Sequence, residues 1–206
     1  DGTLWSWGNN GKGPLGLSDL TNRSSPVQVG TNTWSKVSGG LYSSSSIRSD
    51  GTLWACGYNA YGQLGLGDTS DRLSLVQVGT NTWSSVACGY HHTAAIRGDG
   101  TLWGWGQNSS GQLGTSNTTS YSSPVQVGTS NGWSSIYAQL HSLAIRSDNT
   151  LWACGINSFG QLGQNDVVNR SFPTQLGYGL YSNWSQVSCG YYLSLIHISE
   201  PTRPLY

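Results

Sequence analysis

Three histidines account for most of the acid–base chemistry that this chain could perform: His91, His92 and His141. An imidazole works as a general base when a second side chain positions it, as in a Ser-His-Asp triad. The spacing of these residues predicts neither such a triad nor a pair of carboxylates, so we expect a protein that is not an enzyme. His92 and His141 each precede a Thr or Ser at a recurring position and are interpreted as structural, whereas His91 departs from that pattern and can face solvent.

Four cysteines are the other candidates for chemistry, but they occupy only two recurring positions. Cys56 and Cys154 lie in Trp-Ala-Cys-Gly, and Cys88 and Cys189 lie in Val-x-Cys-Gly. Zinc sites and thiol redox centres are typically marked by Cys-x-x-Cys, which is absent from the sequence. We therefore predict small buried thiols and neither a metal ion nor a cofactor.

These residues recur because the chain is built of repeats. The phrase Asp-Gly-Thr-Leu-Trp begins at Asp1, Asp50 and Asp99, and returns with Asn in its second place at Asp148, an interval of 49 residues each time. A fixed period of this length is typical of solenoids and propellers. A residue found at the same position in every copy is expected to serve the fold, so a residue that breaks the pattern is the better candidate for function.

The local patterns within one copy are those of β-strands. Short β-branched and aromatic runs are bounded by Gly, Asn, Ser and Pro, and no stretch shows a sustained helical period. The Asp99-Gly100 pair lies between two apolar runs, which is a strong signal for a hairpin. We predict an all-β fold with four strands per period, here around residues 76–78, 83–88, 93–97 and 101–105.

Several phrases recur in a fixed order in the copies and together carry a resemblance to a known family. Gly-Gln-Leu-Gly begins at Gly62, Gly111 and Gly160, and Val-Gln-Val-Gly begins at Val27, Val76 and Val125. Over residues 1–192 the chain resembles the regulator of chromosome condensation repeat. The resemblance implies a seven-bladed β-propeller with four antiparallel strands per blade. Kelch repeats are of similar length, but they carry a recurrent Gly-Gly pair that occurs only once here, at Gly39-Gly40.

Four copies are too few for seven blades, so we expect an open arc of about four blades and interpret the chain as a fragment. Residues 193–206 leave the repeat pattern and resemble the translation of a sequencing adapter. We therefore expect a non-native tail there, although a divergent natural tail or a capping segment is the alternative.

Composition argues against two kinds of partner. Only 9% of residues are charged and the net charge at pH 7 is zero, so no basic face of the kind that neutralises nucleic-acid phosphates is expected. No apolar run is long enough to span a bilayer. Many charges also recur with the repeat, and we expect them to satisfy the backbone of turns: Arg48, Arg97 and Arg146, and Asp19, Asp68 and Asp166.

Ten tryptophans suggest a platform for sugars, but eight of them recur at two repeat positions, which favours packing. Only Trp7 and Trp105 vary, alternating with Cys56 and Cys154, so a platform made of these two is a minor alternative.

Aromatic residues that break the repeat pattern are the candidate interaction surface, because aromatic side chains dominate binding hot spots. They are Tyr58, Tyr61, Tyr90, His91, Tyr121, Phe159, Tyr178 and Tyr181. The plain alternative is that they simply cover the ends of blades.

Members of the family that this chain resembles include a nucleotide-exchange factor, an inhibitor of β-lactamases and propellers fused to other domains. The first hypothesis is therefore a non-enzymatic protein-interaction scaffold. A secreted or surface-exposed adhesive module is the second, which the scarcity of Lys and Glu favours weakly. Exchange-factor activity toward a small GTPase is the third. The identity of the protein partner does not follow from the sequence.

Overall fold

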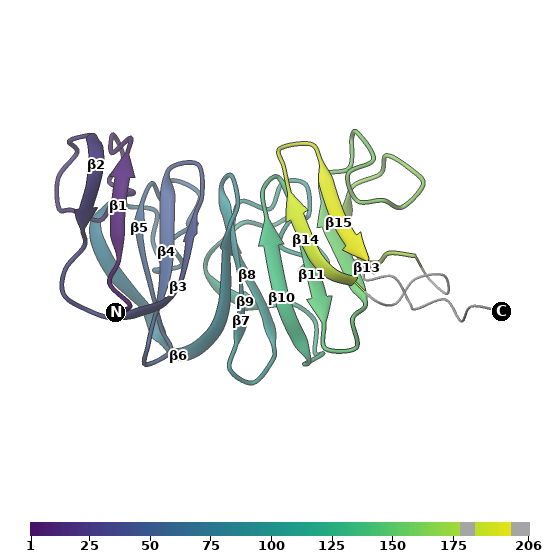
Figure 1. The fold of residues 1–206 in the computed structure, drawn as a ribbon. Helices are drawn as coiled ribbons and strands as arrows, with labels where there is room; N and C mark the ends of the chain where they lie inside the picture. The colour runs from purple at the N-terminus through teal and green to yellow at the C-terminus, as the bar shows by residue number, and fades with distance from the viewer. Residues whose placement is uncertain (178–183, 199–206) are drawn as a thin grey trace.

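The computed structural model describes residues 1–177 and 184–198, and in these residues the chain is all-β, as expected (Figure 1). Its strands are β1 (Trp5–Gly8), β2 (Arg23–Gln28), β3 (Trp34–Gly39), β4 (Ser43–Arg48), β5 (Thr52–Gly57), β6 (Arg72–Cys88), β7 (His92–Arg97), β8 (Leu102–Gly106), β9 (Tyr121–Gln126), β10 (Trp133–Ala138), β11 (His141–Arg146), β12 (Leu151–Gly155), β13 (Arg170–Gln175), β14 (Trp184–Cys189) and β15 (Ser194–Ile198).

The strands form antiparallel blades in chain order. Blade 1 consists of β3, β4, β5 and the first part of β6, and blade 2 of the last part of β6 with β7, β8 and β9. Blade 3 consists of β10 to β13. Half-blade N (β1 and β2) precedes them, and half-blade C (β14 and β15) follows. The long β6 passes from blade 1 to blade 2 without a break, which joins their strands into one sheet.

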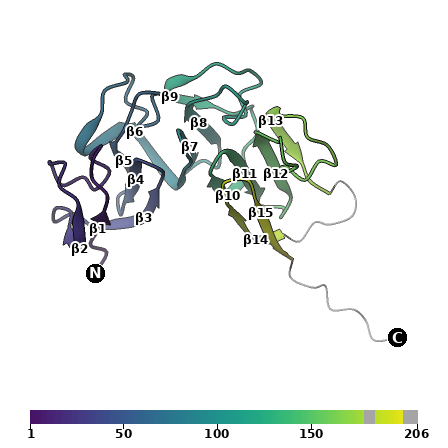
Figure 2. The ribbon, with the colours of Figure 1, turned by 90° about the horizontal axis from the view of Figure 1, so that it is seen from above.

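Seen from above, the blades are arranged around an open arc (Figure 2). The first strands of the blades, such as β10 and β14, lie on the concave side, and the fourth strands, such as β9 and β13, lie on the convex side. The described residues therefore have the architecture of about four propeller blades that do not close into a ring.

The recurrent Asp-Gly-Thr-Leu-Trp phrase builds the turn between the second and third strand of a blade. In blade 1, Trp54 Nε1 donates to Thr52 Oγ1, and that hydroxyl donates to Asp50 Oδ1. Gly51 has a φ of +85°, which a residue without Cβ adopts freely. Asn149 takes the same place in blade 3 with a φ of +60°, because Asn tolerates this region better than most residues.

The recurrent Asn organises the loop between the third and fourth strand. Asn59 is fully buried; its Oδ1 accepts the N–H of Leu64, and its Nδ2 donates to the Asp68 carbonyl oxygen. Asn10, Asn108 and Asn157 make the same contacts in the other copies. The loop therefore closes on a buried amide and holds its backbone without regular structure.

The core lies between blades. Ile47 and Leu53 of blade 1 form one buried cluster with Val86, Ala95 and Trp105 of blade 2. Further clusters join blade 2 to blade 3 and blade 3 to half-blade C. Each blade thus buries its apolar face on its neighbour, as repeat architectures require.

The charged residues of the repeat divide into two groups. Asp19, Asp68 and Asp166 each accept a backbone N–H two residues further on, as expected for turns. The arginines stack on tryptophans: the Arg97 guanidinium lies 3.4 Å from the ring centroid of Trp103. Arg48 and Arg146 likewise lie over Trp rings. Arg146 Nη2 also donates to the loop carbonyl oxygen of Asn131, as expected. The sequence pattern missed this cation–π role because the stacked rings lie on the neighbouring strands.

The end of the described chain continues the blade pattern. Residues 194–198 form β15, which pairs with β14, and Ser194 Oγ donates to the carbonyl oxygen of Gln161. Ser142 makes the equivalent bond to Gln112 one blade earlier. The assignment of residues 193–206 to a non-native tail stays a prediction, and residues 199–206 lie outside the described part of the chain.

Candidate functional site

Aromatic side chains meet on the turns and loops at one end of the blades. In Figure 1 the β10–β11 and β14–β15 turns lie at this end, and the β7–β8 turn lies at the opposite end. The residues concerned come from the turn after the first strand and from the loop after the third strand of several blades. We call them the aromatic belt: Tyr42, Tyr58, Tyr61, Tyr90, His91, Phe159, Tyr191 and Tyr192.

The belt begins at the junction of blades 1 and 2. His91 stacks on Tyr61 with ring centroids 4.6 Å apart, and its other neighbours are Tyr58 at 5.8 Å and Tyr90 at 4.4 Å. Tyr42 adds an edge contact to Tyr58 at 6.4 Å. Edge-to-face and offset arrangements of this kind are those that aromatic rings prefer.

The belt continues past blade 3 to half-blade C. Tyr90 reaches Tyr191 with ring centroids 5.6 Å apart, although blade 3 lies between their strands in sequence. The β10–β11 turn has only Gln139 and Leu140 between its strands, one residue fewer than the β6–β7 turn, and Tyr90 N donates to the carbonyl oxygen of Gln139. This hydrogen bond joins the β6–β7 turn to the β10–β11 turn.

At its far end the belt is formed by three rings in contact. Tyr191 and Tyr192 lie 4.5 Å apart, and Tyr192 lies 4.6 Å from Phe159. Phe159 is 68% exposed, and both tyrosines are also exposed. An apolar ring held this far into solvent contributes little to the core, so its contact surface is free for a partner.

The belt carries no formal charge near neutral pH. Partial burial lowers the pKa of His91, and the neighbouring phenol of Tyr191, with burial second, raises the pKa of Tyr90. Both shifts favour the neutral form at pH 7. At the end nearest half-blade N a charged pair, Lys12 and Asp71, lies beside the rings.

The structure brings together five of the eight residues predicted from the sequence: Tyr58, Tyr61, Tyr90, His91 and Phe159.

Tyr121 is not part of the belt. It lies at the start of the outer strand β9, where its phenol oxygen accepts a hydrogen bond from Asn117 Nδ2. Tyr178 and Tyr181 lie outside the described residues.

Sequence reasoning missed Tyr42, Tyr191 and Tyr192. Each lies in the turn between the first and second strand of its blade, at the position of Tyr90 or of His91. The signal was available, since three of the four copies carry aromatic rings in this turn. The sequence prediction included Tyr90 and His91 at these positions but not the aromatic residues of the other copies.

The other candidates have structural roles. His92 and His141 are buried and hydrogen-bond to hydroxyls of the next blade. Trp105 is fully buried and donates to the Gln63 carbonyl oxygen, so the sugar platform with the exposed Trp7 is wrong. Within the described residues, no group of three or more His, Cys, Asp or Glu side chains is placed to hold a metal ion.

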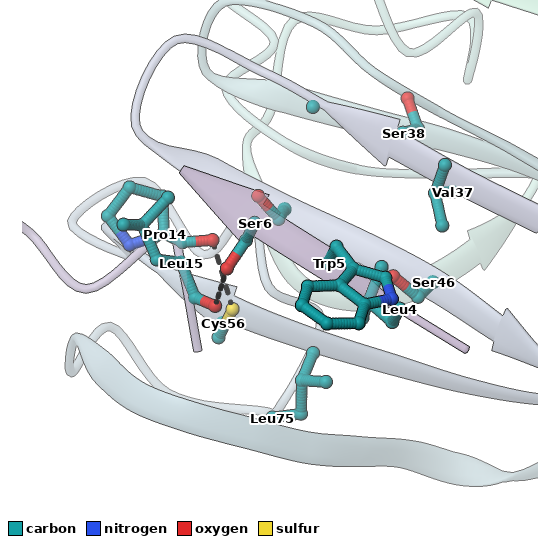
Figure 3. Close-up of a pocket in the computed structure, with 12 residues that line it drawn as sticks. Leu4, Trp5, Ser6, Pro14, Leu15, Val37, Ser38, Ser46, Cys56 and Leu75 are labelled. Carbon is teal, nitrogen blue, oxygen red and sulfur yellow. Dashed lines mark hydrogen bonds between the residues drawn. The ribbon is translucent and has the colours of Figure 1, made fainter. Parts of the chain in front are cut away.

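One cavity of about 140 Å³ lies between half-blade N and blade 1 (Figure 3). Trp5, Val37 and Leu75 line it, and none of the described residues around it is charged. Two of the polar groups that Figure 3 shows there are already engaged, since Ser6 Oγ donates to the Leu15 carbonyl oxygen and Cys56 Sγ to that of Pro14. This cavity is therefore a wide seam between blades and is not a candidate site.

A family profile matches each of the four copies of the repeat. The profile of the regulator of chromosome condensation (RCC1) repeat matches residues 1–47, 50–96, 99–140 and 148–196, which is most of the chain. The chain belongs to the regulator of chromosome condensation repeat family. A second profile of this repeat family matches residues 83–112. A search of curated proteins found no match.

Solved structures show the same fold. The present chain superimposes on Prp20p from Saccharomyces cerevisiae with a TM-score of 0.83 at 18% sequence identity. The superposition covers 98% of the present chain and 52% of Prp20p. Yeast RCC1 (Prp20) bound to Kap60 gives the same score and identity, with 98% and 51% covered. Human WBSCR16 gives a TM-score of 0.77 at 21% identity, with 91% and 52% covered. The present chain thus spans about half the length of these propellers.

The comparisons confirm the predicted family and the β-propeller architecture. At these identities the likeness shows the fold alone, and propellers of one fold serve different functions. Within the described residues, the structure contains no helix with the length and apolar character of a membrane span.

Proposed function

We propose that this chain is a non-enzymatic protein-interaction scaffold and that the aromatic belt is its contact face. The observation that carries the proposal is the continuity of the belt, which runs from Tyr42 to Phe159 through ring contacts of 4.4 to 6.4 Å. Residues separated by more than one hundred positions in sequence thereby form one surface on a rigid set of blades.

The chemistry of the belt suits a protein surface. Tyrosine offers a large rigid ring with a polar hydroxyl and loses little conformational entropy on binding, so it is enriched in binding sites for proteins. The belt's rings are partly exposed and uncharged at neutral pH, which lowers the desolvation cost of contact.

The structural neighbours support testing a protein partner first. The description of Prp20p names binding to Gsp1p and histones, and another structure contains the same protein bound to Kap60. These partners belong to Prp20, and the present chain covers about half of it. The adhesive alternative gains no support from Trp105, because the blades enclose that ring.

Selection of protein binders from a displayed library, followed by affinity measurements on variants, tests the proposal. The repeats supply replacements that the fold accepts: Tyr90→Leu introduces the residue of Leu41, and Phe159→Ser introduces that of Ser110. We expect each to weaken a binder of this face by about tenfold or more, which is typical of hot-spot residues.

The control is Phe172→Ser, which removes an exposed ring from the outer strand β13 and introduces the residue of Ser123; no ring contact joins Phe172 to the described belt residues. It should leave affinity unchanged. Binders that tolerate both belt substitutions, or that respond equally to Phe172→Ser, would contradict the belt as contact face.

A further inference from the structure

One end of the aromatic belt holds an ammonium group of the chain itself. Lys12 Nζ lies over the ring of Tyr58, 5.3 Å from its centroid, and 3.8 Å from Asp71 Oδ2. The first distance is within the range of cation–π attraction, and the second is an ion pair. Lys12 comes from half-blade N, whereas Tyr58 and Asp71 come from blade 1, so the contact crosses a seam between blades.

Neighbouring rings hold Tyr58 in place. Tyr42 lies 6.4 Å from it at an interplanar angle of 81°, and Tyr61 lies 6.3 Å from it at 73°. His91 approaches at 5.8 Å and 55°. A ring braced on several sides keeps its face presented to a cation, which is what aromatic cages for ammonium groups require.

The negative charge of Asp71 is not required by the fold. Asp71 Oδ1 accepts the N–H of Asn59 at 2.8 Å. At the same repeat position Asn22 and Asn169 make the same bond with a neutral side chain, also at 2.8 Å. The charge and the second carboxylate oxygen of Asp71 are therefore additional to its structural bond, and they face an ammonium group.

Lys12 is not required by the repeat either. The same position carries Tyr61, Ser110 and Phe159 in the other copies. The Lys12 side chain is half exposed and that of Asp71 is 35% exposed. Ion pairs this accessible are weak, so an incoming ammonium group can take the place of Lys12.

We propose that Tyr58 and Asp71 form an ammonium-binding site that takes a lysine side chain of a protein partner, and that Lys12 occupies this site in the free chain. The present occupant is the basis for naming lysine, because both the ring face and the carboxylate already hold a primary ammonium. The inference rests on the proposed function only for the protein that carries the lysine.

Titration with small probes tests the site by itself. The probes are N-acetyl-lysine N-methylamide, its uncharged norleucine counterpart and choline. NMR shifts of the His91 ring, whose centroid lies 5.8 Å from that of Tyr58, give the affinity in every variant. Lys12→Ser, which introduces the residue of Ser110, opens the site. We expect this variant to bind the lysine probe about five- to tenfold more tightly than the unsubstituted chain, because the Lys12 side chain no longer competes with the probe for the site.

Two further substitutions in the Lys12→Ser background assign the contacts. Tyr58→Ile introduces the residue of Ile156, and Asp71→Asn introduces that of Asn22. Each should weaken lysine binding several-fold while thermal melting stays unchanged, since other copies accept both residues.

Three results would each overturn the site: a gain of less than about twofold in Lys12→Ser, equal binding of the lysine and norleucine probes, or tighter binding of choline than of lysine. The proposed function has a separate outcome. If the lysine probe binds as expected but protein binders ignore Tyr90→Leu and Phe159→Ser, the ammonium site stands and the belt as contact face does not.

Discussion

His92 Nε2 lies 2.8 Å from Ser142 Oγ, and this hydroxyl donates to the carbonyl oxygen of Gln112, so blade 3 is held between two groups of blade 2. His141 repeats the contact with Ser194 at 2.7 Å, and Ser194 donates to Gln161. Adjacent blades are thus joined by polar contacts in the core as well as by apolar packing, and burial favours the neutral imidazole in each contact.

The first prediction concerns the pH dependence of stability. Burial lowers the pKa of His92 to about 3 and that of His141 to about 4, whereas an imidazole in an unfolded chain has a pKa of about 6.5. Below pH 6.5 the unfolded state binds protons that the folded state refuses, so stability falls as pH falls. Each histidine contributes about 1.4 kcal/mol per pH unit between its two pKa values.

Urea unfolding at pH 7, 6 and 5 measures this slope. The matched variant is His92→Ser, because Ser43 occupies that position in blade 1. It should be less stable at pH 7 and should show about half the slope. A stability that does not change from pH 7 to 5 would show that the imidazoles are accessible to protons.

The second prediction concerns the buried amide of the loop. Asn59→Ala removes the acceptor of the Leu64 N–H and the donor to the Asp68 carbonyl oxygen. Because both backbone groups lose their partner, we expect a loss of about 2–4 kcal/mol. Asn32→Ala, at an exposed position, should change stability by less than about 0.5 kcal/mol. Equal effects in chemical denaturation would contradict a structural role for the amide.

The third prediction concerns the varying tryptophan position. Trp105 is fully buried between blades 1 and 2, whereas Trp7 is 59% exposed at the same repeat position. Trp105→Cys should cost about 3–5 kcal/mol through the cavity that it leaves, although Cys occupies this position in other blades. Trp7→Cys should cost less than about 1 kcal/mol. Urea unfolding of the two variants measures these losses. Equal shifts of the two unfolding midpoints would contradict the difference in burial.

The fourth prediction concerns thiol reactivity. Burial raises the pKa of Cys56 and Cys154 to about 12, and the pKa of Cys189 to about 12 as well. The thiolate is the reactive form, so these cysteines should resist iodoacetamide at pH 8 in the folded chain. Mass spectrometry after addition of denaturant should show labelling of all four cysteines. Rapid labelling without denaturant would mean that the blades open.

The sequence by itself determined the repeat, its four strands, the turns and the family. These follow from local rules: Asp50, Gly51 and Thr52 specify a turn among themselves, and Asn59 closes a loop on residues within ten positions. Such contacts lie within one repeat, so a period of 49 residues is enough to reveal them.

Tertiary structure decided what depends on neighbouring blades. Trp105 is buried because its ring packs against Gly65 and Gln63 of blade 1, whereas Trp7 at the same repeat position is 59% exposed. Tyr90 meets Tyr191 past the intervening blade 3, and Lys12 reaches Tyr58 across a seam. Contacts between repeats depend on how neighbouring blades are oriented relative to one another. The sequence pattern within one repeat does not encode that orientation.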